Sequence, residues 1–342
     1  MNWGKVLRNL IFLASVGLAV HLILPQIPGL ARSARLISTS SHLLVALAFL
    51  CEVLSYLSYG ELLRRASGLT SRRRIARLYA FRLTVVGNGA ARVLPGGGAA
   101  SAAVTYGGLR SRGLEARRIG GVVATVGTLV YAALAGISLL SLTYLLLTDE
   151  LSGAQSVFAT LALAVTLALV ATALAAYRYP NATKCLVLRV SGPAFRLVER
   201  LAPGKGLARR LERLLAEVRG DIRGAVRQMR GRPFEEVRLV GLAFGYWLFD
   251  AACLVVMFHA FGVEASILHL LVAYGIATAA GNLPITPGGI GVFEATIFAT
   301  LGVLGVGAEA IIPVLAYRLF NFWLPIPLAA VLYPTLGLHR KV

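Results

Sequence analysis

The sequence predicts an all-α fold: a polytopic membrane helical bundle that contains two re-entrant helix hairpins in an inverted repeat. Three observations lead to this prediction. The 342-residue chain is 57% hydrophobic and only 14% charged, long apolar segments recur along it, and two of these segments are interrupted by Gly and Pro. Soluble domains carry about 25% charged residues. We therefore expect a single integral membrane domain that covers residues 1–342.

Apolar segments of membrane-spanning length are the first element of this prediction. A helix needs about 20 predominantly apolar residues to cross roughly 30 Å of hydrocarbon. We place six full spans, at residues 10–24, 42–59, 119–147, 157–177, 237–261 and 310–333.

The distribution of charge predicts the orientation. The net charge is +19, with six Arg between residues 64 and 77, four between 110 and 118, and fifteen Lys or Arg between 178 and 238. The loops on the other side instead contain Asp149, Glu150, Glu264 and Glu309. Because loops rich in Lys and Arg stay on the cytoplasmic side, we expect a multi-pass protein of the inner (cytoplasmic) membrane with both termini cytoplasmic.

The basic segments raise the question of a nucleic-acid partner. A nucleic-acid site typically combines basic residues with aromatic ones, whereas these segments contain few aromatics and follow the span ends, so we expect no nucleic acid as partner. Residues at about 178–236 form a cytoplasmic basic segment whose middle part predicts an amphipathic helix. That helix suits the anionic inner leaflet, and an ordinary linker helix packed on the bundle is the alternative.

Two apolar stretches do not fit the six spans. Residues 78–109 lie between Arg-rich segments, and residues 266–304 lie between Glu264 and Glu309, so each should enter and leave on one face, from opposite sides. Their breaks are similar: "GNGAARVLPGG" begins at Gly87 and "GNLPITPGG" at Gly281. With the neighbouring spans they define repeat 1, about 42–147, and repeat 2, about 237–333. Inverted repeats with interrupted helices are typical of transporters, whose site lies between the repeats.

The breaks themselves predict a polar cavity. Non-helical backbone at membrane depth is tolerated only where protein or a water-filled cavity satisfies it. Pro ends the preceding helix, and Gly permits positive φ and close approach. The half-helix that follows each break would direct its N-terminal N–H groups into the cavity, which favours an anion such as a phosphate.

Candidate site residues come from the breaks and from the ionisable residues at membrane depth, which are costly there and usually functional. The expected substrate-binding residues are Asn88, Arg92, Pro95, Gly96, Gly97, Asn282, Pro287, Gly288, Gly289, Glu294 and Arg318.

Individual roles follow from side-chain chemistry. Arg92 is the expected phosphate ligand, because guanidinium binds phosphate through two parallel hydrogen bonds. Arg318 could pair with Glu294 or meet the substrate. Glu52 and Asp250 occupy matched places in the two repeats, which suits gating or ion coupling; structural pairing within the bundle is the alternative. Asn88 and Asn282 are expected to satisfy broken backbone.

The break sequences also carry a family resemblance. "NLPITPGGIGVFE" (282–294) and "NGAARVLPGGGAASAAVTYGGLRSRG" (88–113) resemble the transmembrane domain of the lysylphosphatidylglycerol synthase/flippase family, which includes the flippase half of the multiple-peptide-resistance factors. The resemblance covers essentially the whole chain and implies a lipid-translocating role. Gly97, Gly98 and Ala99 stand where the family often has acidic or polar residues, so the headgroup stays open. The synthase activity is not implied.

The expected function is that of a lipid flippase or transporter. Its partner would be a membrane lipid with a phosphate-bearing headgroup, either a phospholipid or a polyprenyl-phosphate-linked lipid. We expect no catalytic constellation, metal site or cofactor, because no His, Cys and Asp residues have the required spacing. A membrane-embedded lipid-modifying transferase and an ion or small-solute secondary transporter are the alternatives. The sequence leaves a homodimer open.

Overall fold

The computed structural model describes residues 40–70, 75–94, 97–147, 152–178, 233–283 and 286–337. All regular elements in these ranges are helical, so the all-α prediction is confirmed. The expected first span, almost all of the basic segment at about 178–236, and Pro95 and Gly96 lie outside the described residues.

Four stretches of the described chain are long and apolar enough to cross a membrane: His42–Leu69, Arg118–Leu147, Pro233–Ala260 and Ala308–Leu336. They coincide with four of the six predicted spans. The first three belong to α3 (His42–Thr70), α6 (Ala116–Leu147) and α10 (Pro233–Ala260). The span predicted at 157–177 lies in α7 (Gly153–Arg178), of which Gly153–Ala168 counts as a shorter apolar helix.

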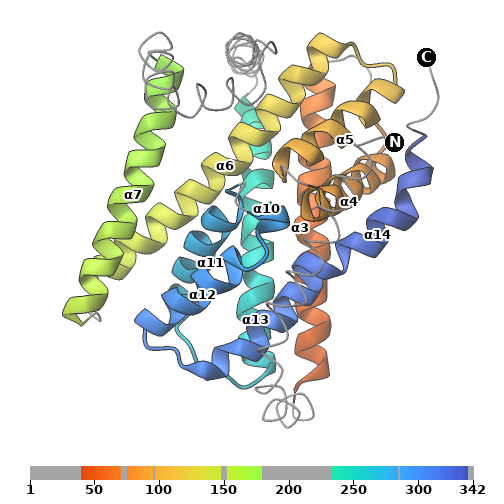
Figure 1. The fold of residues 1–342 in the computed structure, drawn as a ribbon. Helices are drawn as coiled ribbons and strands as arrows, with labels where there is room; N and C mark the ends of the chain where they lie inside the picture. Colours follow the sequence, from red (N-terminus) through yellow and green to blue (C-terminus); the bar gives the residue numbers. More distant parts are fainter. Residues whose placement is uncertain are drawn as a thin grey trace, which may run out of the picture.

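Helices α3 and α10 pack side by side and antiparallel at the centre of the molecule (Figure 1). At one end, the N–H of Ser41 donates to the carbonyl of Ala260 over 3.0 Å. At the other end, Arg65 forms a 2.8 Å ion pair with Glu235. Midway, the hydroxyl of Ser55 donates to the carbonyl of Tyr246. This pair is the central frame of the described helices.

Two pairs of short helices flank the frame: α4 (Arg77–Val93) with α5 (Gly98–Ser111), and α11 (Ile267–Gly281) with α12 (Val292–Val303). They contain 12 to 17 residues each, so they are about 18–26 Å long, less than the hydrocarbon thickness. The α4–α5 pair lies in the upper half of Figure 1 and the α11–α12 pair in the lower half. Re-entry into the membrane and the inverted repeat stay predictions.

The last membrane segment is interrupted. The sequence predicts one continuous span at 310–333 and does not predict this interruption. After the short helix η3 (Ala308–Ala310), α13 (Ile311–Arg318) passes into a π-turn, η4 (Leu319–Trp323), before α14 (Pro325–Leu332) and η5 (Tyr333–Leu336). The N–H of Leu324 reaches the carbonyl of Leu319, five residues back. Pro325 has no N–H to continue the regular α-helical ladder. π-turns inside helices occur frequently at functional sites.

Helix α14 packs closely against α4. The contact depends on Gly89, because a Cβ at this position would overlap the Ala329 side chain and lie 2.9 Å from the Pro325 carbonyl oxygen. The C-terminal segment is therefore held directly against the helix that leads into the first break.

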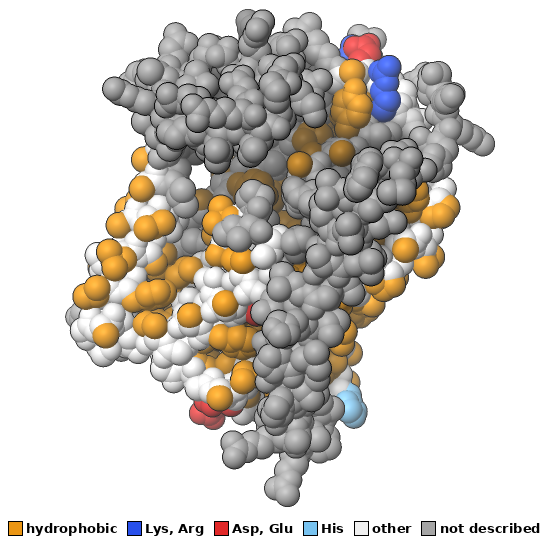
Figure 2. All heavy atoms as spheres, viewed as in Figure 1, with side chains coloured by type: hydrophobic (Ala, Val, Ile, Leu, Met, Phe, Trp, Pro, Cys, Tyr) orange, Lys and Arg blue, Asp and Glu red, His pale blue; other side chains and the backbone are white. Residues whose placement is uncertain are grey.

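The described surface has the character of a membrane protein. Hydrophobic side chains cover the middle of the face in Figure 2, whereas charged side chains gather toward its upper and lower ends. Large apolar residues of α6 and α7 are strongly exposed, including Leu140 at 69% and Val165 at 60%. Such surfaces are unfavourable in water and suited to lipid. The assignment of the faces to cytoplasm and exterior stays a prediction.

Candidate functional site

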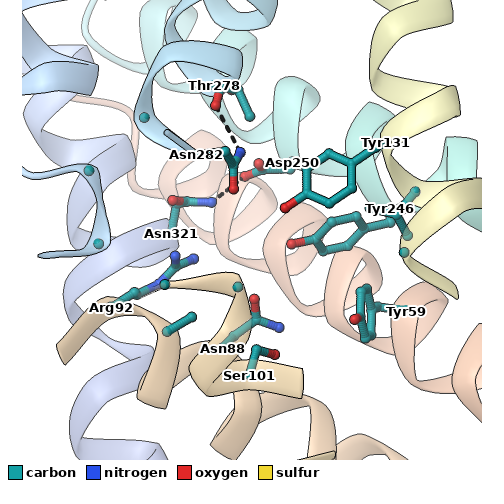
Figure 3. Close-up of a pocket in the computed structure, with 18 of the residues that line it drawn as sticks. Tyr59, Asn88, Arg92, Ser101, Tyr131, Tyr246, Asp250, Thr278, Asn282 and Asn321 are labelled. Carbon is teal, nitrogen blue, oxygen red and sulfur yellow. Dashed lines mark hydrogen bonds between the residues drawn. The ribbon is translucent and has the colours of Figure 1, made fainter. Parts of the chain in front are cut away.

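A cavity of about 360 Å³ lies where the short helix pairs meet α6, α10 and the π-turn. Figure 3 shows Arg92, Asn282 and Asn321 directed toward a common space, with Tyr131 and Tyr246 across from them. The polar side chains that line it are Tyr59, Asn88, Arg92, Ser101, Thr105, Tyr131, Tyr246, Asp250, Thr278, Asn282, Thr286, Tyr317, Arg318 and Asn321.

The second break packs directly on the end of helix α4. It contains the short helix η2 (Pro287–Gly289), in which Gly288 has φ +61° and Gly289 has φ +72°. A Cβ on Gly288 would lie 2.6 Å from the carbonyl oxygen of Arg92, and one on Gly289 would overlap the backbone of Gly281. Only Gly combines positive φ with such close approach. The expected role of these two glycines is therefore observed.

Arg92 lies in the last turn of α4 and lines the cavity. Its guanidinium is 3.5 Å from the Tyr56 hydroxyl and 5.4 Å from the centre of the Phe322 ring. Its Nε is buried without a hydrogen-bond partner. Within the described part of the chain, no carboxylate forms an ion pair with Arg92, so its charge has no direct counter-ion. Gly97, with φ +46°, also lines the cavity at the N-terminus of α5.

Arg318 is buried and has a fixed partner. Its Nε lies 2.5 Å from Oε1 of Glu294, and its guanidinium stacks on Phe293 and Phe322 at 4.5 and 4.3 Å. Of the two expected roles for Arg318, the structure has the pairing with Glu294. The Nη2 of Arg318 is nevertheless buried without a partner, on a residue that lines the cavity.

Glu294 is placed behind Arg318 and does not line the cavity. Its second oxygen accepts the N–H of Gly291 over 2.7 Å at the start of α12. The expectation that this helix directs its first N–H groups into the cavity therefore does not hold at Gly291. Glu294 caps the helix and neutralises Arg318 instead.

Asp250 of α10 is 3% exposed, yet it lines the cavity. It accepts hydrogen bonds from the hydroxyls of Tyr274 (2.7 Å) and Tyr317 (3.1 Å) and from the amide of Asn321 (2.7 Å). These donors come from α11, α13 and the π-turn. Glu52 of α3 is 4% exposed and lies beside Asp250. The two acids that the sequence predicts at matched positions are thus neighbours in the fold.

Asn88 and Asn282 have the same local role at the two breaks. Each side-chain amide donates to the carbonyl four residues earlier, that of Thr84 (3.1 Å) and that of Thr278 (2.8 Å). Both also line the cavity. The carbonyl of Thr278 also accepts the backbone N–H of Asn282, and Thr84 lies within α4, so the expected role of satisfying broken backbone stays a prediction. Pro287 begins η2, and its side chain is not among those described.

Several residues in or next to the cavity wall are not identified from the sequence. Tyr274, Tyr317 and Asn321 surround Asp250, and Phe322 lies between the two arginines. A Tyr or Asn in an apolar segment is a weak signal because its partner is distant in sequence. Pro325, which follows the π-turn, is the stronger signal. Among the residues that the structure describes, no group of three His, Cys, Asp or Glu could hold a metal ion.

Comparison with known proteins identifies the family. The family model described as the lysylphosphatidylglycerol synthase TM region matches residues 11–329. The chain belongs to this family. It is a family of membrane proteins of the flippase kind, in agreement with the resemblance carried by the two break sequences.

Two curated relatives are UPF0104 membrane proteins of Methanothermobacter thermautotrophicus. One is 29% identical to this chain over 151 residues, which are 42% of this chain and 43% of the relative. The other is 24% identical over 129 residues, 37% of this chain and 38% of the relative. The matched region thus spans about two fifths of each of these relatives.

Proposed function

We propose that the protein is a flippase or transporter that moves a phospholipid or a polyprenyl-phosphate-linked lipid across the cytoplasmic membrane through the central cavity. The observation that carries this proposal is the environment of Arg92. Its guanidinium faces the cavity at membrane depth without a carboxylate partner in the described chain. A buried guanidinium that has no carboxylate in ion-pair contact and an unsatisfied Nε can still bind an anionic ligand, and a lipid phosphate is such an anion.

The surroundings of Arg92 favour a phosphate over other anions. Guanidinium donates two parallel hydrogen bonds to phosphate oxygens. Arg318 supplies a second, unpaired donor from its Nη2, and both guanidinium groups contact the ring of Phe322. The N-terminus of α5 begins at the cavity beside Gly97 and Gly98. A helix N-terminus favours negative charge through its free N–H groups and its dipole.

The size of the cavity supports a headgroup rather than a whole lipid. About 360 Å³ lies at the lower end of the range for small-molecule sites. In the proposed mechanism, the phosphate enters this space while the apolar tails remain in the surrounding hydrocarbon. Movement of the short helix pairs relative to the α3–α10 frame would then expose the cavity to one leaflet and then the other.

A binding experiment tests the assignment of the phosphate. Purified protein would be titrated with dioctanoyl phosphatidylglycerol and with dioctanoylglycerol, which has the same tails and no phosphate, by following intrinsic tryptophan fluorescence. We expect the phosphate-bearing lipid to bind about tenfold or more tightly, because charge-assisted hydrogen bonds contribute about 1.5–3 kcal/mol. Arg92→Gln should remove that difference.

The matched control is Arg77→Gln, at the other end of α4, where the side chain is 82% exposed. This variant should bind both lipids as the wild type does. Equal binding of the two lipids by the wild type would contradict the proposal. Tight binding of glycerol 3-phosphate, a headgroup without tails, would instead favour a small-solute transporter.

A further inference from the structure

Two acidic side chains lie side by side in the most buried part of the bundle. Glu52 of α3 and Asp250 of α10 are 4% and 3% exposed, and the antiparallel packing of the two helices, in which Ser55 bonds to Tyr246 and Ser41 to Ala260, brings the two acids to the same level. In the described chain, no Lys or Arg forms an ion pair with either group. The titratable and charged groups next to them are Cys51 and Tyr56 of α3, Arg92 of α4, Tyr246 and Cys253 of α10, Tyr274 of α11, and Tyr317 of α13.

Two buried carboxyl groups that lie side by side cannot both be ionised without a bridging cation. Repulsion between like charges and the loss of water both oppose the doubly charged state, so such a pair shares one proton. The pair is then an acid and a carboxylate joined by a hydrogen bond.

The hydrogen bonds around the pair show where the proton resides. Asp250 accepts three hydrogen bonds, from Tyr274, Tyr317 and Asn321, which stabilise a carboxylate. Glu52 has the opposite environment, because its Oε2 is buried without a partner. Glu52 therefore carries the proton and donates it toward Asp250.

The pair is connected to the cavity on one side only. Asp250 lines the cavity together with Arg92 and Arg318, whereas Glu52 of α3 is not among the residues that line it. Figure 3 shows Asp250 beside the space into which Arg92 and Asn321 are directed. A proton can therefore enter or leave through Asp250, in the same space that would receive the lipid phosphate.

We propose that Glu52 and Asp250 form a proton-binding site, and that binding of a lipid phosphate in the cavity is linked to occupancy of this site by one proton. The linkage between the proton and the lipid phosphate rests on the proposed function. When the proton leaves, the pair gains one negative charge close to Arg92 and opposes an incoming phosphate. When the proton is bound, the phosphate is favoured. By linkage, the bound phosphate strengthens proton binding to the same extent. A phosphodiester anion and one proton would then cross together without net charge.

Glu294 is a second glutamate at membrane depth whose environment differs from that of Glu52. It is also buried at membrane depth, but Arg318 and the N–H of Gly291 satisfy its ionised form. Glu52 has no such pair of donors, which distinguishes its environment from that of Glu294.

Infrared difference spectroscopy tests the proton site without any lipid. Spectra of the purified protein at neutral and alkaline pH would be compared in the carbonyl region of protonated carboxylic acids. We expect a band that disappears on alkalinisation, that shifts when the glutamates carry ¹³C, and that is absent in Glu52→Gln. The isotope measurement uses the wild-type chain, so it stands even if the variant is unstable. Absence of the band, or a band that does not shift with ¹³C-glutamate, would overturn the proton site.

Phosphate binding as a function of pH tests the linkage. The affinity for dioctanoyl phosphatidylglycerol, whose phosphodiester does not titrate near neutral pH, should fall by up to about tenfold per pH unit as the pair loses its proton. Glu52→Gln, which has no acidic proton to lose, should bind the lipid with little dependence on pH. A wild-type affinity that is independent of pH across the loss of the infrared band would overturn the linkage.

The two experiments separate this inference from the proposed function. A Glu52 band in a protein that binds no phosphate-bearing lipid would retain the proton site and overturn both the linkage and the lipid function. Phosphate-dependent lipid binding without a Glu52 band would retain the lipid function and overturn the proton site.

Discussion

The two arginines of the cavity differ in one respect that separates structure from function. Arg318 and Arg92 contact the same Phe322 ring, and both line the cavity. Arg318 has Glu294 at 2.5 Å, so its charge is compensated within the protein. Arg92 has only the Tyr56 hydroxyl at 3.5 Å. A buried arginine with a carboxylate is part of the fold, whereas one without it is available to a ligand.

The difference follows from the two breaks. The second break is followed by Glu294, three residues into α12 after Gly291, where it both caps the helix and holds Arg318. The first break is followed by Gly98 and Ala99, so the N-terminus of α5 brings no acidic side chain to Arg92. Similar break sequences therefore produce one closed and one open cation site.

The largest effect on stability is expected for Glu294→Gln. The change leaves Arg318 buried without its counter-ion, and loss of one partner of a buried pair typically costs about 3–5 kcal/mol. The free energy of unfolding in detergent should fall by this amount. Glu309→Gln is the matched control, because Glu309 accepts the N–H of Gly307 in an exposed turn and has no buried arginine. Equal losses for the two variants would contradict a stabilising role for the Glu294–Arg318 pair.

The next effect concerns the backbone of the second break. Gly289→Ala would place a methyl group against the backbone of Gly281 at positive φ. Strain and overlap together should cost about 2–4 kcal/mol. Gly262→Ala isolates the strain, since Gly262 has φ +66° and open space around it. Thermal unfolding of both variants should show the larger loss for Gly289→Ala, and identical losses would argue against tight packing at the break.

The smallest expected stability effect belongs to Arg92. Because Arg92 has no counter-ion in the described chain, Arg92→Gln should change the unfolding free energy by less than about 1 kcal/mol, or increase it. Arg318→Gln, measured in parallel, should be clearly destabilising, since it leaves Glu294 buried and unpaired. A large loss for Arg92→Gln would show that Arg92 stabilises the fold as Arg318 does.

Much of the fold can be predicted from the sequence because lipid imposes strong rules on it. The length of the apolar segments predicts the spans that correspond to α3, α6 and α10. Gly and Pro residues mark the breaks before α5 and α12. Glu52 and Asp250 stand out in the sequence as acids within apolar spans, although their proximity is visible only in the fold. These features depend on local composition and spacing.

The rest of the site depends on packing between distant segments. Tyr274 and Asn321 reach Asp250 across 24 and 71 residues, respectively. The π-turn that presents Asn321 arises from hydrogen bonding around Pro325, which a count of apolar residues does not register. Likewise, Glu294 is an obvious candidate ligand in the sequence, and only the approach of α12 to α13 makes it the partner of Arg318 instead.

The most direct test of the central claim is lipid translocation itself. Purified protein would be reconstituted into liposomes that carry a fluorescent phospholipid, and the label that becomes accessible to an external quencher would be followed with time. We expect the wild type and Arg77→Gln to expose label from the inner leaflet. Arg92→Gln should be slower by about 10- to 100-fold, the equivalent of one charge-assisted contact, while remaining folded. Translocation by Arg92→Gln at the wild-type rate would contradict a role for Arg92 in binding the lipid phosphate.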